Sequence, residues 1–172
     1  LGQHSPIFYA MFSNESMTEA RDGEVYIQDA KYESVRLMVE FMYTGSTDSL
    51  DSCNNIEDVL AVADKYEVLV LKEQCERIIA GTINLKNITV IAIFSDMYSA
   101  QYLKNAVIRF LTANHKNVIR TPEWKSLKRE RHDLANELLE AVLSSPSHEF
   151  DDDHIKCSGP VRKRLRRTPF GK

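Results

Sequence analysis

The spacing of apolar residues predicts α-helices along most of the chain. Between residues 35 and 42, apolar side chains recur at i, i+3, i+4 and i+7, namely at Val35, Met38, Val39 and Met42. This spacing places them on one face of a helix, and Gly45 is a typical residue to end it. The sequence therefore predicts an amphipathic helix here, with its apolar face on a core.

The first 28 residues predict one helix and one strand. Ser5 and Pro6 mark a helix start, because serine caps free amide groups and proline fits the first helical position. The apolar run 7–12 continues this helix. After an Asp-Gly turn at residues 22–23, residues 24–28 alternate polar and apolar side chains, which predicts a short β-strand.

The middle of the chain contains a repeat with a period of 32 residues. Residues 63–79 align with residues 95–111, and the matched positions are Asp64 with Asp96, Tyr66 with Tyr98, Leu71-Lys72 with Leu103-Lys104, and Arg77 with Arg109. Each copy predicts a helical hairpin, and stacking the copies buries apolar faces that one hairpin alone would expose. The aspartate and the lysine recur together, which predicts structural capping or ion pairing rather than a catalytic pair.

Two further helices are predicted before the end of the chain. Thr121 and Pro122 mark the start of one, and we expect Trp124 to anchor it on the hairpins. The second begins at about Asp133 and turns its apolar residues inward: Leu134, Leu138, Leu139 and Val142. Residues 145–172 have little to bury, so we expect disorder there.

Charge is divided unevenly along the chain. The 172 residues are 43% hydrophobic and carry a formal net charge of −3. Residues 156–172 hold seven basic and no acidic residues, which leaves 15 basic against 25 acidic residues in the rest. An acidic body with a basic tail is typical of a protein that uses its tail for interactions.

Cysteine and hydropathy patterns predict a reducing compartment and no membrane span. The three cysteines are widely spaced without a CxxC motif, which disfavours a disulfide framework and a zinc module. No apolar run approaches the ~20 residues that a transmembrane helix needs.

The sequence also lacks the motifs of common enzyme classes. It contains no phosphate-binding glycine loop, no HExxH and no GxSxG. His148, Asp151–Asp153, His154 and Cys157 fit no metal-site spacing, and we interpret them as a polar linker. The prediction is a protein that is not an enzyme and uses no metal or cofactor.

Several segments together resemble the BTB/POZ family, and within it the speckle-type POZ proteins. In chain order they are residues 5–12 (SPIFYAMF), 41–45 (FMYTG), 63–66 (ADKY), 96–100 (DMYSA), 121–126 (TPEWKS) and 162–165 (RKRL). The resemblance covers nearly the whole chain. It implies an α+β, predominantly helical fold, with a BTB/POZ domain at 1–82, a three-box/BACK-like helical extension at 83–144 and a disordered tail at 145–172.

The resemblance implies a substrate adaptor of a cullin-3 RING ubiquitin ligase. Such an adaptor binds the N-terminal region of the cullin and promotes the ubiquitination and proteasomal degradation of its substrates. The first BTB strands and the substrate-capturing MATH domain of the family have no counterpart here. We therefore expect an N-terminally truncated chain that binds substrates and forms homo-oligomers only at full length. The alternative is a BTB oligomerisation or transcriptional-corepressor module without a ubiquitin role.

Five residues match positions that contact the cullin in this family. Met17 and Glu19 match its hydrophobic-x-Glu motif, in a loop ahead of the predicted strand. The thioether suits an apolar pocket of a partner, and the carboxylate suits a basic group or a helix N-terminus. Tyr43, Lys65 and Tyr66 are the other candidates. The two tyrosines are equally good candidates for the core.

The basic tail fits a short nuclear-localisation signal that binds importin. Its cations are Arg162, Lys163, Arg164, Arg166 and Arg167. Closely spaced cations suit an acidic importin groove, which predicts a nuclear protein. The alternative is a non-specific contact with nucleic acid or acidic surfaces.

Overall fold

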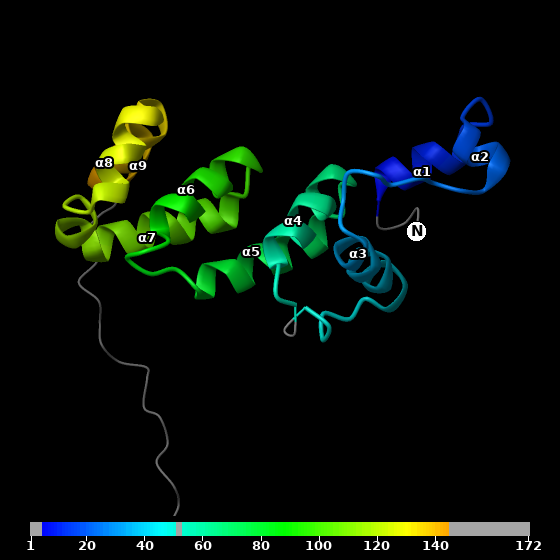
Figure 1. Cartoon of the computed structure of the whole chain (residues 1–172), viewed down its shortest axis with the longest axis horizontal. Helices are drawn as coiled ribbons and strands as arrows, with labels where there is room; N and C mark the ends of the chain where they lie inside the picture. The colour runs from blue at the N-terminus through cyan, green and yellow to red at the C-terminus, as the bar shows by residue number, and fades with distance from the viewer. Residues whose placement is uncertain (1–4, 51–52, 145–172) are drawn as a thin grey trace, which may run out of the picture.

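The computed structural model describes residues 5–50 and 53–144, and its regular elements in these ranges are α-helices (Figure 1). The first five are α1 (Pro6–Ser13), α2 (Thr18–Asp22), α3 (Tyr32–Thr44), α4 (Ile56–Lys65) and α5 (Leu69–Gly81). The others are α6 (Ile88–Met97), α7 (Gln101–Val118), α8 (Pro122–Glu130) and α9 (His132–Ser144). The prediction of a predominantly helical fold is confirmed.

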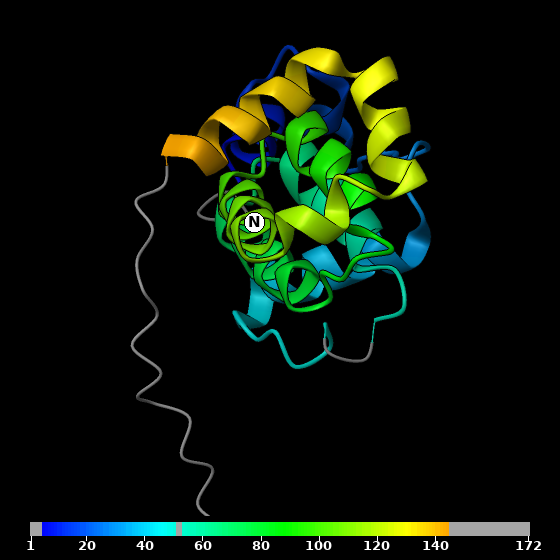
Figure 2. The same cartoon turned by 90° about the vertical axis from the view of Figure 1, so that its left-hand side faces the viewer.

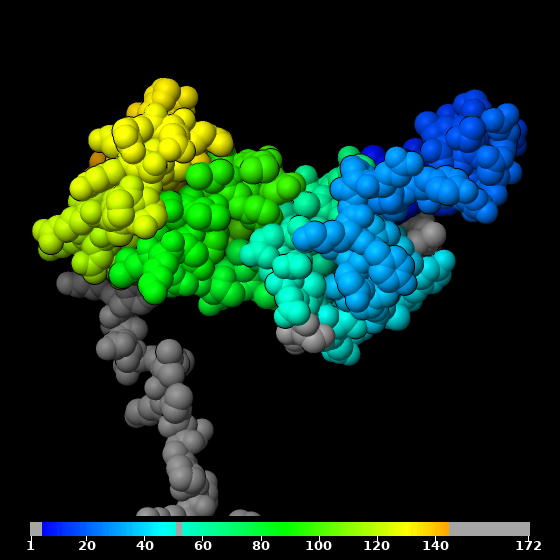
Figure 3. Space-filling view, in the orientation of Figure 1, coloured from blue at the N-terminus to red at the C-terminus, as the bar shows by residue number. Residues whose placement is uncertain are grey.

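The helices follow one another in space nearly in sequence order. α3 packs on α4, α4 on α5, and α5 on α7, which also contacts α6 and α9. Figure 1 shows the elongated row that results, with α1 and α2 at one end and α8 and α9 at the other, and Figure 2 shows the same row from its α8–α9 end. In the space-filling view, α2 and the chain around it protrude from this row (Figure 3). A cluster of buried side chains runs through the row from Phe8 to Leu138.

The predicted helix ends form as the residue types require. The Ser5 hydroxyl accepts a hydrogen bond from the Phe8 amide at 3.2 Å, and the Thr121 hydroxyl accepts one from the Trp124 amide at 3.2 Å. Gly45 ends α3 in the left-handed conformation, at φ 67°. Trp124 is only 3% exposed, which confirms its predicted role as an anchor in the core.

The 32-residue repeat is a repeat of structure. α4 and α5 form one helical hairpin, and α6 and α7 form the next. Both turns place a non-glycine residue at positive φ, Glu67 at 52° and Ser99 at 48°. In both, the amide after that residue bonds the carbonyl oxygen five residues earlier in the chain at 2.8 Å. The two hairpins therefore share their turn geometry as well as their sequence pattern.

The predicted aspartate–lysine ion pairs are both present. Lys72 Nζ lies 2.7 Å from Asp64, and Lys104 Nζ lies 3.4 Å from Asp96. Each lysine also binds a group further along the chain. Lys72 donates to the Tyr98 carbonyl oxygen at the end of α6, and Lys104 pairs with Glu137 of α9. Burial lowers the pKa of Lys104, but its bonds to Glu137 and Asp96 raise that pKa above the usual value overall. The ion pairs thus connect consecutive units of the row.

One contact between the hairpins has no sequence signature. Glu76 of α5 is 5% exposed, and its carboxylate accepts a hydrogen bond from the Leu103 amide in the first turn of α7 at 3.0 Å. The first amides of a helix lack partners within the helix, so the carboxylate satisfies one of them. The repeat places Ile108 at the position equivalent to Glu76. This buried cap is therefore a feature of the first hairpin alone within the repeat.

The predicted strand at residues 24–28 does not form, so that expectation is wrong. The segment is irregular in the structure, and Val25 and Ile27 pack against the core while Tyr26 is 81% exposed. Alternation predicts which side chains turn inward, but a strand also needs a neighbouring strand for its amide and carbonyl groups. The described residues provide no such neighbour.

The remaining predictions concern the last helix, membrane-spanning helices and residues 145–172. α9 begins at His132, one residue before the expected start, and buries Leu134 and Leu138 as predicted. In the described ranges, no helix has the length and apolar character to cross a membrane. The predicted disorder at 145–172 lies outside the described residues.

Candidate protein-interaction surface

The Met17–Glu19 segment begins a short helix rather than lying in a loop. Asn14 forms the turn before it, because its side-chain oxygen accepts hydrogen bonds from both the amide and the hydroxyl of Ser16, at 3.1 and 2.6 Å. Met17 is the N-cap of α2, with a side chain that makes no capping bond and is 40% exposed. Glu19 lies in the first turn and is partly exposed. An apolar and an acidic side chain thus lie two residues apart in the sequence on the protruding end of the molecule.

Buried contacts of α1 hold this end in place. Phe8 is 4% exposed and stacks on the ring of Tyr66, with centroids 4.7 Å apart and planes at 7°. The Ser5 hydroxyl also donates a hydrogen bond to the Tyr66 carbonyl oxygen. α1 is therefore fixed to the turn between α4 and α5, and it carries α2 with it. A partner that contacts Met17 would therefore bind a surface that is fixed to the folded core.

Tyr66 is buried, so the surface role considered for it is corrected to a core role. Its side chain is 3% exposed beneath Phe8. A fully buried ring has no surface to offer a partner. The alternative of a core aromatic, which the sequence left open, is the one that the structure supports.

Lys65 lies on the surface and pairs with the segment before α3. Its Nζ lies 2.6 Å from Asp29 and 5.3 Å from the centroid of the Tyr66 ring. The hydrogen bond between them lowers the pKa of Asp29 and raises that of Lys65. A second ion pair, Lys31 with Asp58 at 2.6 Å, holds the same segment on α4. These exposed pairs position the chain between α2 and α3 but contribute little to stability.

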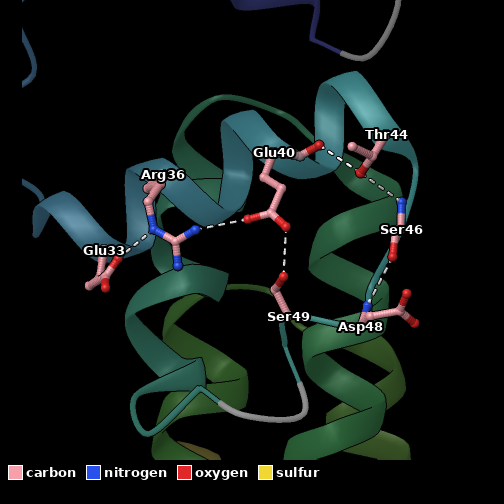
Figure 4. Close-up of polar contacts among 7 residues, drawn as sticks. All are labelled: Glu33, Arg36, Glu40, Thr44, Ser46, Asp48 and Ser49. Carbon is pink, nitrogen blue, oxygen red and sulfur yellow. Dashed lines mark hydrogen bonds and ion pairs between the residues drawn. The ribbon is translucent and has the colours of Figure 1, made fainter.

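Tyr43 lies near the C-terminal end of α3 and is 72% exposed. The helix end is fixed by a chain of polar contacts that Figure 4 shows along α3 and the following loop. Arg36 binds Glu33 and Glu40 at 2.7 and 2.9 Å, and the Ser49 hydroxyl donates to Glu40 at 2.6 Å. The phenol ring of Tyr43 is therefore presented from a rigid helix end.

The loop after α3 continues this polar chain. The Thr44 hydroxyl donates to the Glu40 carbonyl oxygen at 2.8 Å and accepts from the Ser46 amide at 3.1 Å. The Ser46 hydroxyl then accepts from the Asp48 amide at 3.1 Å (Figure 4). Short polar side chains that bond the backbone two residues away are typical of such turns.

Two further features of the described residues are a hollow beside α4 and a buried thiol in α5. A hollow of about 420 Å³ with charged and apolar lining residues lies between residues 29–31 and α4, beside the two ion pairs that join them. Within residues 5–50 and 53–144, no three His, Cys, Asp or Glu side chains are placed to hold a metal ion. Burial raises the pKa of the Cys75 thiol to about 12, so it stays protonated at neutral pH. The metal candidates at 148–157 and the basic signal at 162–167 lie outside the described residues.

Sequence reasoning missed the exposed tyrosines near the protruding end. Tyr9, Tyr26 and Tyr32 are 63, 81 and 79% exposed. The alternation at residues 24–28 contained a signal for Tyr26, because it placed Val25 and Ile27 on one side and Tyr26 on the other. Exposed aromatic residues are enriched where proteins bind other proteins. The exposed tyrosines therefore add aromatic surface to the part of the molecule that carries Met17.

Comparisons with known proteins identify the family. Residues 1–83 match the family model described as "BTB/POZ domain". The chain is 62% identical to "BTB and MATH domain-containing protein 42" of Caenorhabditis elegans, over 98% of this chain and 42% of that protein. It is 30% identical to "Protein maternal effect lethal 26" of the same organism, over 83% of this chain and 36% of that protein. The chain is a BTB/POZ-domain protein, similar to the BTB and MATH domain proteins.

A mammalian relative is similar over the same region. "TD and POZ domain-containing protein 3" of Mus musculus is 32% identical over 84% of this chain and 40% of that protein. The chain thus spans about two-fifths of the length of the curated relatives it matches. A BTB/POZ domain is a module for protein–protein interaction and oligomerisation, and BTB/MATH family proteins are adaptors rather than enzymes.

Proposed function

We propose that this chain is the cullin-binding part of a substrate adaptor for a cullin-3 RING ubiquitin ligase. In that role it binds the N-terminal region of the cullin, so that substrates held elsewhere in the full-length protein are ubiquitinated and degraded by the proteasome. Membership of the BTB/POZ family supports this role. The observation that carries it is the exposed Met17, two residues before Glu19 at the start of a helix that α1 fixes to the core.

The physical basis is a small apolar contact next to a charge. Burying the exposed part of the Met17 side chain contributes roughly 1–2 kcal/mol. The flexible thioether adapts to the shape of an apolar pocket. A bond from Glu19 to a basic group or a helix N-terminus fixes the orientation. Tyr43 and Lys65 would contribute flanking contacts, whereas Tyr66 supports the surface from within.

A binding titration with the cullin-3 N-terminal domain tests this site. The double variant Met17→Ala with Glu19→Ala is expected to bind at least about tenfold more weakly than wild type, since 1.4 kcal/mol is a factor of ten. The matched control is Glu140→Ala with Leu143→Ala, which removes an exposed acidic and an exposed apolar side chain from α9. Equal binding by wild type and the Met17 variant would remove the assigned site.

We further propose that the tail directs the protein to the nucleus through importin. The cations at 162–167 supply the charge density that an acidic groove selects. A fluorescent fusion of the full chain is expected to accumulate in nuclei, and Arg162→Ala, Lys163→Ala and Arg164→Ala together are expected to abolish accumulation. Unchanged nuclear accumulation of the triple variant would contradict this role.

A second candidate function is oligomerisation without a ubiquitin role. It is favoured by Tyr9 and Phe12 of α1, which are 63 and 39% exposed and lie one helical turn apart. If they join two copies, light scattering of the wild-type chain gives a dimer, and Tyr9→Glu with Phe12→Glu gives a monomer. Degradation of partners that does not change when cullin-3 is depleted would favour this candidate over the adaptor.

A further inference from the structure

A basic stripe runs along one side of α5 and α7. It consists of Arg77, Arg109 and Lys116, all exposed, with Tyr102 between the two arginines. The Arg77 guanidinium lies 4.8 Å and the Arg109 guanidinium 5.9 Å from the centroid of the Tyr102 ring. Lys116 is seven residues after Arg109 and so lies on the same face of the helix. The packing of α5 on α7 and the Tyr102 ring therefore fix the relative positions of these cations.

The stripe has an excess of positive charge in an otherwise acidic body. Residues 97–122 contain no aspartate or glutamate. Arg77 pairs with Glu73 at 2.7 Å, but no described carboxylate forms an ion pair with Arg109 or Lys116. Glu137 of α9 lies elsewhere, since it binds Lys104, which is two residues and about 200° around α7 from Tyr102. The stripe is thus available to an acidic group.

We propose that the stripe binds the acidic tract of this same chain, Glu149–Asp153. This tract has four carboxylates in five residues and begins five residues after the end of α9. α9 packs on α7, and five extended residues span up to about 17 Å. Short connections of this kind give local concentrations in the millimolar range. This local concentration favours several weak ion pairs that form together, although they would not hold a separate acidic peptide.

The basic segment of the tail is the competing partner for this tract. Pairing within the tail would order two segments at once, whereas the stripe is already ordered by α5 and α7. Binding of the acidic tract to the stripe therefore costs less conformational entropy than binding to the basic segment. It also separates the acidic tract from Arg162–Arg167, whose cations then remain free for other partners.

Carbodiimide coupling of the full chain, followed by peptide mass spectrometry, tests the contact. The reagent joins carboxylates to lysine amines only where they touch. We expect a link between Lys116 and Asp151–Asp153 within monomers at low salt, falling at least about tenfold in 1 M sodium chloride, where the Debye length is ~3 Å. Arg77→Glu with Arg109→Glu should cause a similar loss in protein whose circular dichroism and melting temperature match wild type.

The controls separate this contact from general charge attraction. Lys128→Glu with Arg129→Glu makes the same charge change on α8 and should leave the link to Lys116 unchanged. Replacing Asp151, Asp152 and Asp153 with Asn leaves the helical body untouched and should remove the link. The proposal is overturned by links only to Lys156, Lys163 or Lys172, by equal links to Lys125 and Lys128, or by links found only between two molecules.

Discussion

The two repeated hairpins both have a largely apolar interior but differ on their exteriors. Their turns and their aspartate–lysine pairs correspond one to one, and the buried Leu71 corresponds to Leu103, whereas Leu60 corresponds to Ala92. On the outer face, Asp58 and Lys65 of α4 are charged and bind residues 29–31, whereas the equivalent Val90 and Met97 of α6 are apolar and 66 and 61% exposed. The comparison shows that packing preserves the inward positions of the repeat, while the outward positions follow whatever covers each hairpin.

Breaking the shared interior should produce the largest effects. Leu71 and Leu103 occupy equivalent sites and are both fully buried. Leu71→Ala and Leu103→Ala should each lower the free energy of unfolding by about 2–5 kcal/mol, because each leaves a cavity in the core. Urea unfolding measures both values. A loss below about 1 kcal/mol in either variant would show that the hairpins do not share one interior.

Removing the cap between the hairpins should have the next largest effect. Glu76→Ala leaves the buried Leu103 amide without its acceptor, which should cost about 1–3 kcal/mol of unfolding free energy. Glu76→Gln retains an acceptor oxygen and should recover much of this loss. Equal destabilisation by both variants would mean that the charge of Glu76, and not its hydrogen bond, joins the hairpins.

The exposed face of α6 should tolerate the residues of α4. Val90→Asp with Met97→Lys copies the charges of the first hairpin onto the second. Substitutions at exposed sites usually change stability by less than about 0.5 kcal/mol. Thermal and urea unfolding should therefore match wild type. A clear destabilisation would show that another part of the protein covers this face.

The ion pair at Lys65 should have the smallest and most local effect. Its contribution is present above the ordinary pKa of aspartate, 3.8, and is lost as the pH falls through the lowered pKa of Asp29. Asp29→Asn should speed amide hydrogen exchange in residues 24–31 at pH 7 and leave α4 unchanged. At a pH below the lowered pKa of Asp29 the variant and wild type should exchange alike, and a difference that persists there would contradict the ion-pair explanation.

The sequence predicted helices wherever local signals agree. Ser5-Pro6 and Thr121-Pro122 supply caps and starts, and the 32-residue period supplies the hairpins, so each element was specified by several residues at once. The strand at 24–28 was not predictable from alternation, because pairing depends on a distant partner. Burial of Tyr66 depends on Phe8, 58 residues away in the sequence, and the cap at Glu76 depends on the packing of α5 against α7. Such contacts become evident only in three dimensions.

The candidate surface was predicted in part. The exposed Met17, Tyr43 and Lys65 lie where a partner can reach them. Met17 and Glu19 were expected in a loop, but the Asn14 turn and the left-handed Gly23, at φ 70°, enclose a short helix. Helical geometry fixes the relative directions of the two side chains more firmly than a loop would.

Isothermal titration of the wild-type chain with the cullin-3 N-terminal domain tests the central claim most directly. The adaptor role predicts saturable binding with one cullin domain per chain, and weaker binding when Met17 and Glu19 are replaced by Ala. A wild-type chain that is folded by circular dichroism and yet gives no binding heat with the cullin domain at about 100 μM would contradict the claim.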